Sequence, residues 1–235
     1  MASGQSLSIL SFGFFSIAVS SFFTDEKPEI VCEHQTGFSL SDNVLRVWLL
    51  LILLCGLITF EHVVLESNIE ATNTLFGTAL IVATVWVPLT SQRSQVAFVF
   101  ASMCMLVVCT LCIAAVTSSS LFNKNAKLFT SRPFSTFGYS FVAGWAFLNA
   151  VVTTMVAFNY NYIPNEKCDD SGSIVPLALA LGVSALSFSF RDPVIAIPTA
   201  WSILNTDKLS LIQAVSLAVL FIATVASLVR FLDRL

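Results

Sequence analysis

Charged residues are scarce in this chain. Only 11% of its 235 residues are Asp, Glu, Lys or Arg, whereas a soluble domain carries about a quarter. The net charge is −3, so there is no basic surface for nucleic acid. The longest polar stretch, residues 24–43, is too short to form a soluble domain. These absences exclude a soluble protein and predict a single membrane domain over residues 1–235.

Residues that build cofactor and catalytic sites are also few. No Lys lies inside an apolar stretch, which excludes a retinal Schiff base. The only two histidines, His34 and His62, cannot ligate a pair of bis-histidine haems. No catalytic triad, phosphate-binding loop or metal-ligand cluster is recognisable. We therefore expect no enzyme activity, no catalytic or metal-binding residues and no required cofactor.

Three cysteines, Cys104, Cys109 and Cys112, have the spacing C-x4-C-x2-C, which occurs in iron–sulfur proteins. Here they lie in the middle of an apolar helix and span about 12 Å along its axis. Their directions around that helix diverge, so they cannot converge on one cluster. The sequence favours ordinary buried residues at these positions.

Apolar residues, by contrast, make up 56% of the chain, and they fall into long stretches. A membrane-spanning helix needs about 20 residues, and roughly 17 is the lower limit. We predict an all-α polytopic membrane bundle with seven to eight transmembrane segments. The predicted segments are Ser6–Phe23, Val44–Leu65, Asn73–Leu89, Gln95–Ser118, Phe134–Tyr160, Ile174–Phe190, Pro193–Leu204 and Leu209–Phe231.

Two of these segments have more than one interpretation. Residues 6–23 could be taken for a signal peptide, but no Lys or Arg precedes Lys27, and we predict a membrane helix. Residues 193–204 fall short of the minimum length and contain Pro193 and Pro198. A short crossing and a re-entrant half-helix both fit this segment, and we favour the crossing.

Eight crossings place both termini on one side of the membrane. The loops of that side carry slightly more Lys and Arg, so the positive-inside rule predicts cytoplasmic termini. Cys32 and Cys168 are the only cysteines outside the apolar stretches, and both then lie on the opposite side. A disulfide between Cys32 and Cys168 and two free loop thiols are both compatible with this arrangement.

Glu61 and His62 are ionisable residues near the end of the second apolar stretch. Ionisable residues within a membrane suggest a proton relay or a ligand site. Both lie within about one turn of Glu66, so we expect their side chains to snorkel to the membrane interface. Proton transport through them is the least favoured function, since no ladder of acidic and basic residues crosses the bundle.

The stretch from Pro133 to Tyr162 is long enough to cross a bilayer and carries no charge. Trp145 and Asn149 are four residues apart, so they share one helical face. Because an amide facing lipid is costly, Asn149 should face protein, water or a ligand. Ser140 and Gly144 offer a surface of small residues for close approach by another helix.

The four tryptophans fall in four different segments. Trp48 and Trp86 lie near segment ends, as in an aromatic belt, whereas Trp145 is in mid-helix. With other residues they resemble the TspO/MBR family of tryptophan-rich membrane proteins, in particular its longer members with three extra C-terminal segments. The matching positions are Gly37-Phe38 followed by Trp48, then Trp86, Arg132-Pro133-Phe134-Ser135, Asn149, and Arg191-Asp192 followed by Ala196 and Trp201. The chain departs from the family at Phe141, where the family has a Trp.

The resemblance implies a five-helix core in residues 1–162 and a three-segment extension in residues 163–235. It also implies an aromatic-lined cavity for a flat apolar ligand of tetrapyrrole or sterol type, which stacking on aromatic rings would favour. Tyr162 belongs to a permissive cholesterol-motif pattern, Val156-x5-Tyr162-x4-Lys167. The expected ligand-binding residues are Phe141, Trp145, Asn149, Trp48, Trp86, Trp201 and Tyr162.

Two functions from different classes remain open. The chain could bind or transport a small hydrophobic ligand without catalysing a reaction. Alternatively, it could be a structural subunit of a larger membrane complex, because short loops and abundant Phe suit a protein that packs against others. The expected partners are the lipid bilayer, a hydrophobic small molecule and either other membrane subunits or further copies of this chain.

Overall fold

A computed structural model describes residues 2–24, 42–64, 70–92, 94–122, 133–159, 175–205 and 210–232. The described residues form helices and no strand, which confirms the all-α prediction. A helix covers each predicted apolar stretch. The helices are α1 (Ala2–Thr24), α3 (Asp42–Val64), α4 (Glu70–Ser91), α5 (Gln95–Phe122), α7 (Pro133–Asn159), α8 (Val175–Phe190), η2 (Pro193–Ala196), α9 (Ile197–Leu204) and α10 (Leu211–Leu232).

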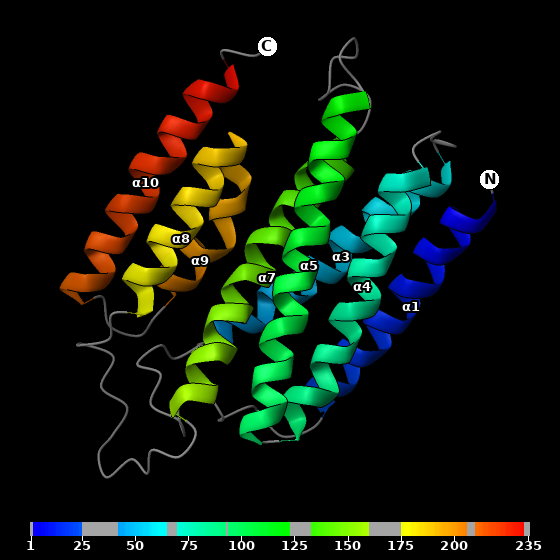
Figure 1. The fold of residues 1–235 in the computed structure, drawn as a ribbon, viewed down its shortest axis with the longest axis horizontal. Helices are drawn as coiled ribbons and strands as arrows, with labels where there is room; N and C mark the ends of the chain where they lie inside the picture. Colours follow the sequence, from blue (N-terminus) through cyan, green and yellow to red (C-terminus); the bar gives the residue numbers. More distant parts are fainter. Residues whose placement is uncertain are drawn as a thin grey trace.

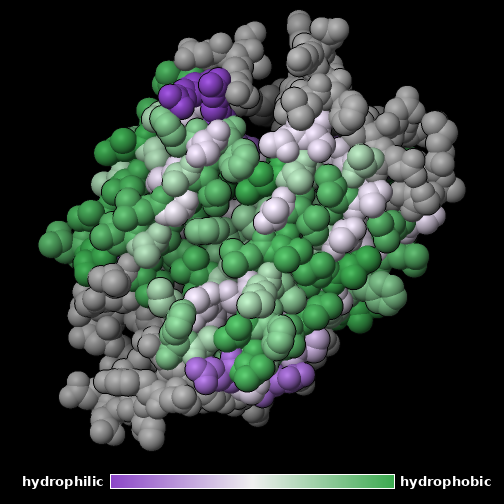
Figure 2. Space-filling view, in the orientation of Figure 1, coloured by the Kyte–Doolittle hydropathy of each residue, from purple (hydrophilic) through white to green (hydrophobic). Residues whose placement is uncertain are grey.

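Among the described residues, four helices are long and apolar enough to cross a membrane. These spans are Ala71–Ser91, Gln95–Ser118, Phe137–Phe158 and Leu211–Arg230. The other apolar helices have shorter apolar parts of 10–17 residues, namely Ser6–Val19, Leu50–Val63, Val175–Phe190 and Pro193–Leu204. Figure 2 shows apolar residues dominating one face between two ends where the hydrophilic residues gather. The chain is therefore a helical membrane protein, and the number of seven to eight crossings stays a prediction.

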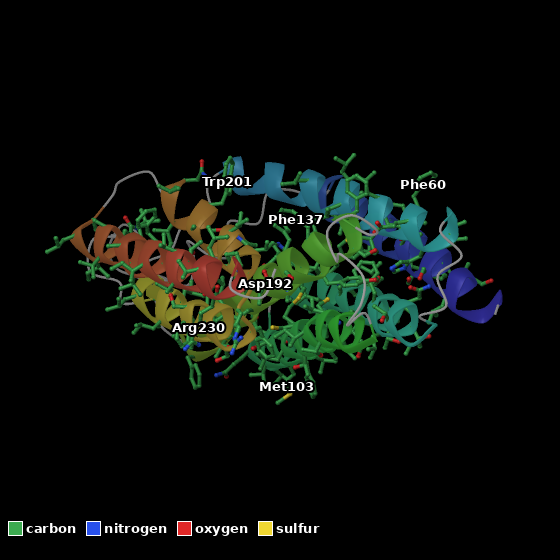
Figure 3. The ribbon with its side chains drawn as sticks, turned by 90° about the horizontal axis from the view of Figure 1, so that it is seen from above. Phe60, Met103, Phe137, Asp192, Trp201 and Arg230 are labelled. Atoms are coloured by element: carbon green, nitrogen blue, oxygen red, sulfur yellow. The ribbon has the colours of Figure 1, made fainter. Side chains whose placement is uncertain are left out.

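Five helices close into a ring. α1 packs between α3 and α4, α5 packs between α4 and α7, and α3 packs against α7 to complete the circuit. From above, α3 lies along one side of this five-helix ring and α5 along the other (Figure 3). The main hydrophobic cluster of the described residues lies inside this ring. Its largest members include Phe15, Phe76, Leu80, Met105 and Trp145.

α7 belongs to two packing units at once. One side of it completes the five-helix ring, and another side contacts η2 and α9. α8 and α10 pack against each other and against η2, forming a second apolar cluster with α7. In Figure 1, α8, α9 and α10 lie side by side on the α7 side of the ring. Of the four candidate spans, the one in α7 is the most buried, because it is covered from both sides.

Successive helices run in alternating directions. The start of α1 and the end of α10 consequently lie at the same end of the molecule, at the top of Figure 1. The α9 segment packs against α7 and also contacts α8 and α10, although residues 193–204 are too short to be counted among the candidate spans. This arrangement agrees with termini on one side, while their cytoplasmic location stays a prediction.

Gly144 allows η2 to approach the backbone of α7. A Cβ atom at Gly144 would lie 2.0 Å from the carbonyl oxygen of Ile195, far inside any van der Waals contact. The small-residue surface that includes Ser140 therefore does receive another helix, as expected. Since backbone lies on both sides of this contact, no side-chain rotation can relieve a clash.

Gly144→Ala should destabilise the protein by about 1–3 kcal/mol, because the added methyl group overpacks the α7–η2 contact. Gly13→Ala is a matched control, since a Cβ at Gly13 in α1 meets nothing within 4 Å. Its higher helix propensity should leave stability unchanged or raise it by up to about 1 kcal/mol. Thermal unfolding of both variants in detergent measures the difference, and equal unfolding temperatures would contradict the close approach.

Candidate functional site

Trp86 and Trp145 meet inside the five-helix ring. They come from α4 and α7, which are not ring neighbours, and their ring centroids are 6.2 Å apart at an interplanar angle of 72°. This is an edge-to-face contact, a favourable geometry for two aromatic rings. Trp145 is only 2% exposed. A mid-helix Trp that the aromatic belt does not explain is therefore part of the centre of the ring.

Phe141 and Asn149 flank Trp145 one turn away on either side of it in α7. Phe141 is buried and stacks on the half-exposed Phe137, with centroids 6.0 Å apart. Asn149 is also buried, and its Nδ2 donates a hydrogen bond of 2.8 Å to the carbonyl oxygen of Trp145. Asn149 thus faces protein, as expected, and its amide is bonded within its own helix.

Of the other predicted ligand-binding residues, Trp201 does not join this centre. Trp201 lies on α9, outside the five-helix ring, and is 45% exposed. Figure 3 places it at the outer edge of the molecule. The backbone of Trp48 lies in α3, but its side chain is outside what the structure describes, and Tyr162 lies outside the described residues. Cys32 and Cys168 also lie outside the described residues, so the disulfide between them stays a prediction.

Glu61 does not snorkel to the interface, and that expectation is wrong. It is 5% exposed, and one of its carboxylate oxygens accepts a 2.6 Å hydrogen bond from the backbone N–H of Ser135. The Ser135 hydroxyl donates to the same oxygen. Ser135 is in the first turn of α7, where N–H groups lack intrahelical acceptors and the helix dipole favours a negative charge. Glu61 therefore caps α7 from α3.

His62 is equally buried, with 2% of its surface exposed. Its Nδ1 lies 3.3 Å from the hydroxyl of Ser8 and its Nε2 lies 2.5 Å from the hydroxyl of Tyr139. A hydroxyl can donate or accept, so both neutral tautomers of His62 are satisfied. Phe76 contacts the His62 ring edge-to-face, with centroids 5.9 Å apart. His62 therefore joins α1, α3, α4 and α7.

Thr72 and Asn73 lie in the first turn of α4 and are 2% and 3% exposed. Thr72 Oγ1 and Asn73 Oδ1 have no hydrogen-bond partner among the described residues. Both residues lie on the same side of α4 as Phe76, which follows them by four and three positions. We refer to Ser8, His62, Thr72, Asn73 and Tyr139 as the polar cluster. It lies at the end of the ring where α1, α4 and α7 begin.

The sequence reasoning did not assemble the polar cluster. Glu61 and His62 stand out in the sequence as ionisable residues, whereas Asn73 is only the first residue of a predicted apolar stretch and Thr72 precedes that stretch. The sequence does contain a usable signal. Because successive spans alternate in direction, polar residues at the end of one span and at the start of the next lie at the same level of the bundle. Which of them face inward depends on how the helices are rotated about their axes.

Asp192 is a second acid beside α7, and it is partly buried. Its carboxylate accepts hydrogen bonds from the Ser140 hydroxyl and from Val194 N at 2.9 Å, so it caps η2. Burial raises the pKa of Asp192 above its ordinary value, and the two hydrogen bonds oppose that shift. Figure 3 shows it in the middle of the molecule, between α7 and the C-terminal helices.

Asp192→Asn should be at least as stable as the unchanged protein at neutral pH. A raised folded pKa means that the folded state holds the Asp192 proton more tightly than the unfolded state. Stability therefore falls as pH rises from the ordinary Asp pKa through the raised one, and Asn removes this loss. Asp192→Ala instead leaves Val194 N–H uncapped and should cost about 1 kcal/mol. Thermal unfolding from acid to neutral pH measures the stability of both variants. A stability difference between the unchanged protein and Asp192→Asn that does not change with pH would contradict the raised pKa of Asp192.

Glu61→Leu should lower the free energy of unfolding by about 1–3 kcal/mol, because two buried donors of Ser135 lose their acceptor. Glu61→Gln keeps an oxygen acceptor and should cost less. Denaturant unfolding in detergent ranks the two variants. Equal stability of both variants and the unchanged protein would mean that Glu61 does not cap α7.

The cysteines of the apolar helices are free thiols, and Cys109 and Cys112 are buried. The described residues contain no group of three or more His, Cys, Asp or Glu side chains that could hold a metal ion. No protein-family model, curated protein or solved structure matches the chain. The function must therefore be argued from the geometry of the five-helix ring.

Proposed function

We propose that this chain is a membrane protein that binds or transports a small, flat, hydrophobic ligand of tetrapyrrole or sterol type inside the five-helix ring. The observation that supports the proposal is the meeting of Trp86 and Trp145 across the ring. Large aromatic side chains, rather than a direct helix–helix contact, connect α4 to α7 at this level. A flat ligand between the two indoles would replace their edge contact with stacking on its own faces.

The chemistry of the interior suits such a ligand. Phe141 and the two tryptophans offer aromatic faces, and Asn149 offers the only amide on that side of α7. Burial against one indole contributes about 1–3 kcal/mol. We limit the site to these four residues, since Trp201 lies on α9, outside the ring, and is 45% exposed. The resemblance to the TspO/MBR family supports the same proposal through its five-helix core.

A structural subunit is the second candidate, and α10 favours it. Only 22% of the candidate span in α10 is buried, and its exposed residues include Phe221, Ile222 and Val229. Lipid or a neighbouring subunit would cover this apolar surface. Figure 1 shows α10 at the outer edge of the molecule, opposite α1.

Trp145→Ala should weaken binding of protoporphyrin or a fluorescent sterol by about tenfold or more, since 1.4 kcal/mol corresponds to a factor of ten. Trp145→Phe should weaken it less, because a phenyl ring keeps one stacking face. Trp201→Ala is the matched control and should leave the affinity unchanged. Titration of the detergent-solubilised proteins, followed by quenching of Trp fluorescence, gives the three affinities.

Saturable quenching that Trp145→Ala weakens and Trp201→Ala does not would support the ligand site. Linear quenching that is identical in all proteins would reject the ligand site and favour the structural subunit. In that case Trp145→Ala should still lower the unfolding temperature, because it leaves a cavity in the ring.

A further inference from the structure

Two oxygen atoms in the polar cluster lack a donor or acceptor. Thr72 Oγ1 and Asn73 Oδ1 are buried and have no hydrogen-bond partner among the described residues. A buried polar atom without a partner costs about 1–3 kcal/mol, so native structures rarely keep one. Something other than the described part of the chain is therefore expected to bond to these two oxygens.

Both side chains are buried on the side of α4 that packs into the bundle. Thr72 and Asn73 are on the Phe76 side of α4, and the Phe76 ring lies 5.1 Å from that of Tyr139 and 5.9 Å from that of His62. Side chains in a helix lean toward its N-terminus. The two oxygens thus lie at the level just beyond Phe76, toward the end of the ring where α4 and α7 begin.

The charges at this end exclude some ligand groups. Glu61 is the acidic neighbour of His62 on α3, and the described parts of α1, α4 and α7 contain no Lys or Arg. Arg46, the one Lys or Arg in α3, lies in the first turns of that helix, away from Glu61 and His62. Among the described residues, a ligand carboxylate would have no Lys or Arg to pair with there, and Glu61 is the nearest acid on α3. A neutral hydroxyl suits the cluster, since it donates one hydrogen bond and accepts two.

We infer that the polar cluster binds the hydroxyl group of a neutral amphipathic ligand, which donates to Asn73 Oδ1 and accepts from Thr72 Oγ1. This inference rests on the proposed function, because the apolar part of the same ligand would lie toward Trp86 and Trp145. Asn73 and Trp86 are separated by about 20 Å along the axis of α4, which a polycyclic alcohol with a short tail can span. Because the described residues supply no Lys or Arg at this end of the ring, the hydroxyl of an alcohol fits the site better than a tetrapyrrole carboxylate.

The test compares one fluorescent sterol, dehydroergosterol, with its methyl ether, which cannot donate a hydrogen bond. Energy transfer from Trp in the detergent-solubilised full chain measures both affinities. The alcohol should bind about five- to tenfold more tightly than the ether. Asn73→Leu should abolish this ratio, and Thr72→Val should reduce it.

Thr90→Val is the matched control. Thr90 is also a buried Thr of α4, but it lies at the far end of the helix and donates to Val87 O at 2.8 Å. It should keep the ratio of the unchanged protein. Because the oxygens of Thr72 and Asn73 have no partner among the described residues, Thr72→Val and Asn73→Leu should not lower the unfolding temperature of the ligand-free protein.

The outcomes separate this inference from the proposed function. Equal binding of alcohol and ether, unchanged by Asn73→Leu, would overturn the hydroxyl site and leave the ligand site standing. A lower unfolding temperature for both Asn73→Leu and Thr72→Val would also overturn it, since their oxygens would then serve internal bonds. Failure of both sterol probes to bind saturably would reject the hydroxyl site, and the same result with protoporphyrin would reject the proposed function as well.

Discussion

The first turns of α7 satisfy the polar groups that other segments bring into the molecule. Ser135 binds the carboxylate of Glu61, Tyr139 binds His62, and Ser140 binds Asp192. In a membrane protein no bulk water can replace these partners, so each ionisable group must be bonded internally. The position of α3 and of the turn before η2 depends on these bonds, because moving either segment would leave a buried acid or imidazole unpaired.

The same helix also sets how closely its neighbours pack. Gly144 removes the side chain at the point where the backbone of η2 crosses α7. Farther along, Ser102 of α5 donates to the carbonyl oxygen of Ala150 at 3.0 Å. Small residues and short polar bonds replace the hydrophobic effect here, since lipid tails are as apolar as the helix surfaces. α7 can therefore be buried on two sides, while most of the surface of α10 remains exposed.

The interior of the five-helix ring has two chemically different parts. Its middle is aromatic and apolar, with Trp86 against Trp145, and its end near the start of α7 is polar, with His62 bonded on both ring nitrogens. Asn73 Oδ1 is buried with no partner in the part of the chain that the structure describes, which a purely structural core does not require. The combination of a flat apolar region and a neutral polar end is the arrangement that an amphipathic ligand requires.

The amino-acid sequence by itself determined the membrane class, the helix positions and the importance of residues 133–159. Hydrophobic length and helical spacing are local properties, so Trp145 and Asn149 could be placed on one face and Ser140 and Gly144 on a contact surface. Only the tertiary structure decided which residues meet. Glu61 and His62 lie near a segment end in sequence, and proximity to the interface predicted exposure, yet α7 and α1 cover them. Trp86 and Trp201 look alike in sequence, but one faces the ring and the other faces outward. The rotation of each helix about its axis decides this, and that rotation is set by packing against helices far away in the chain.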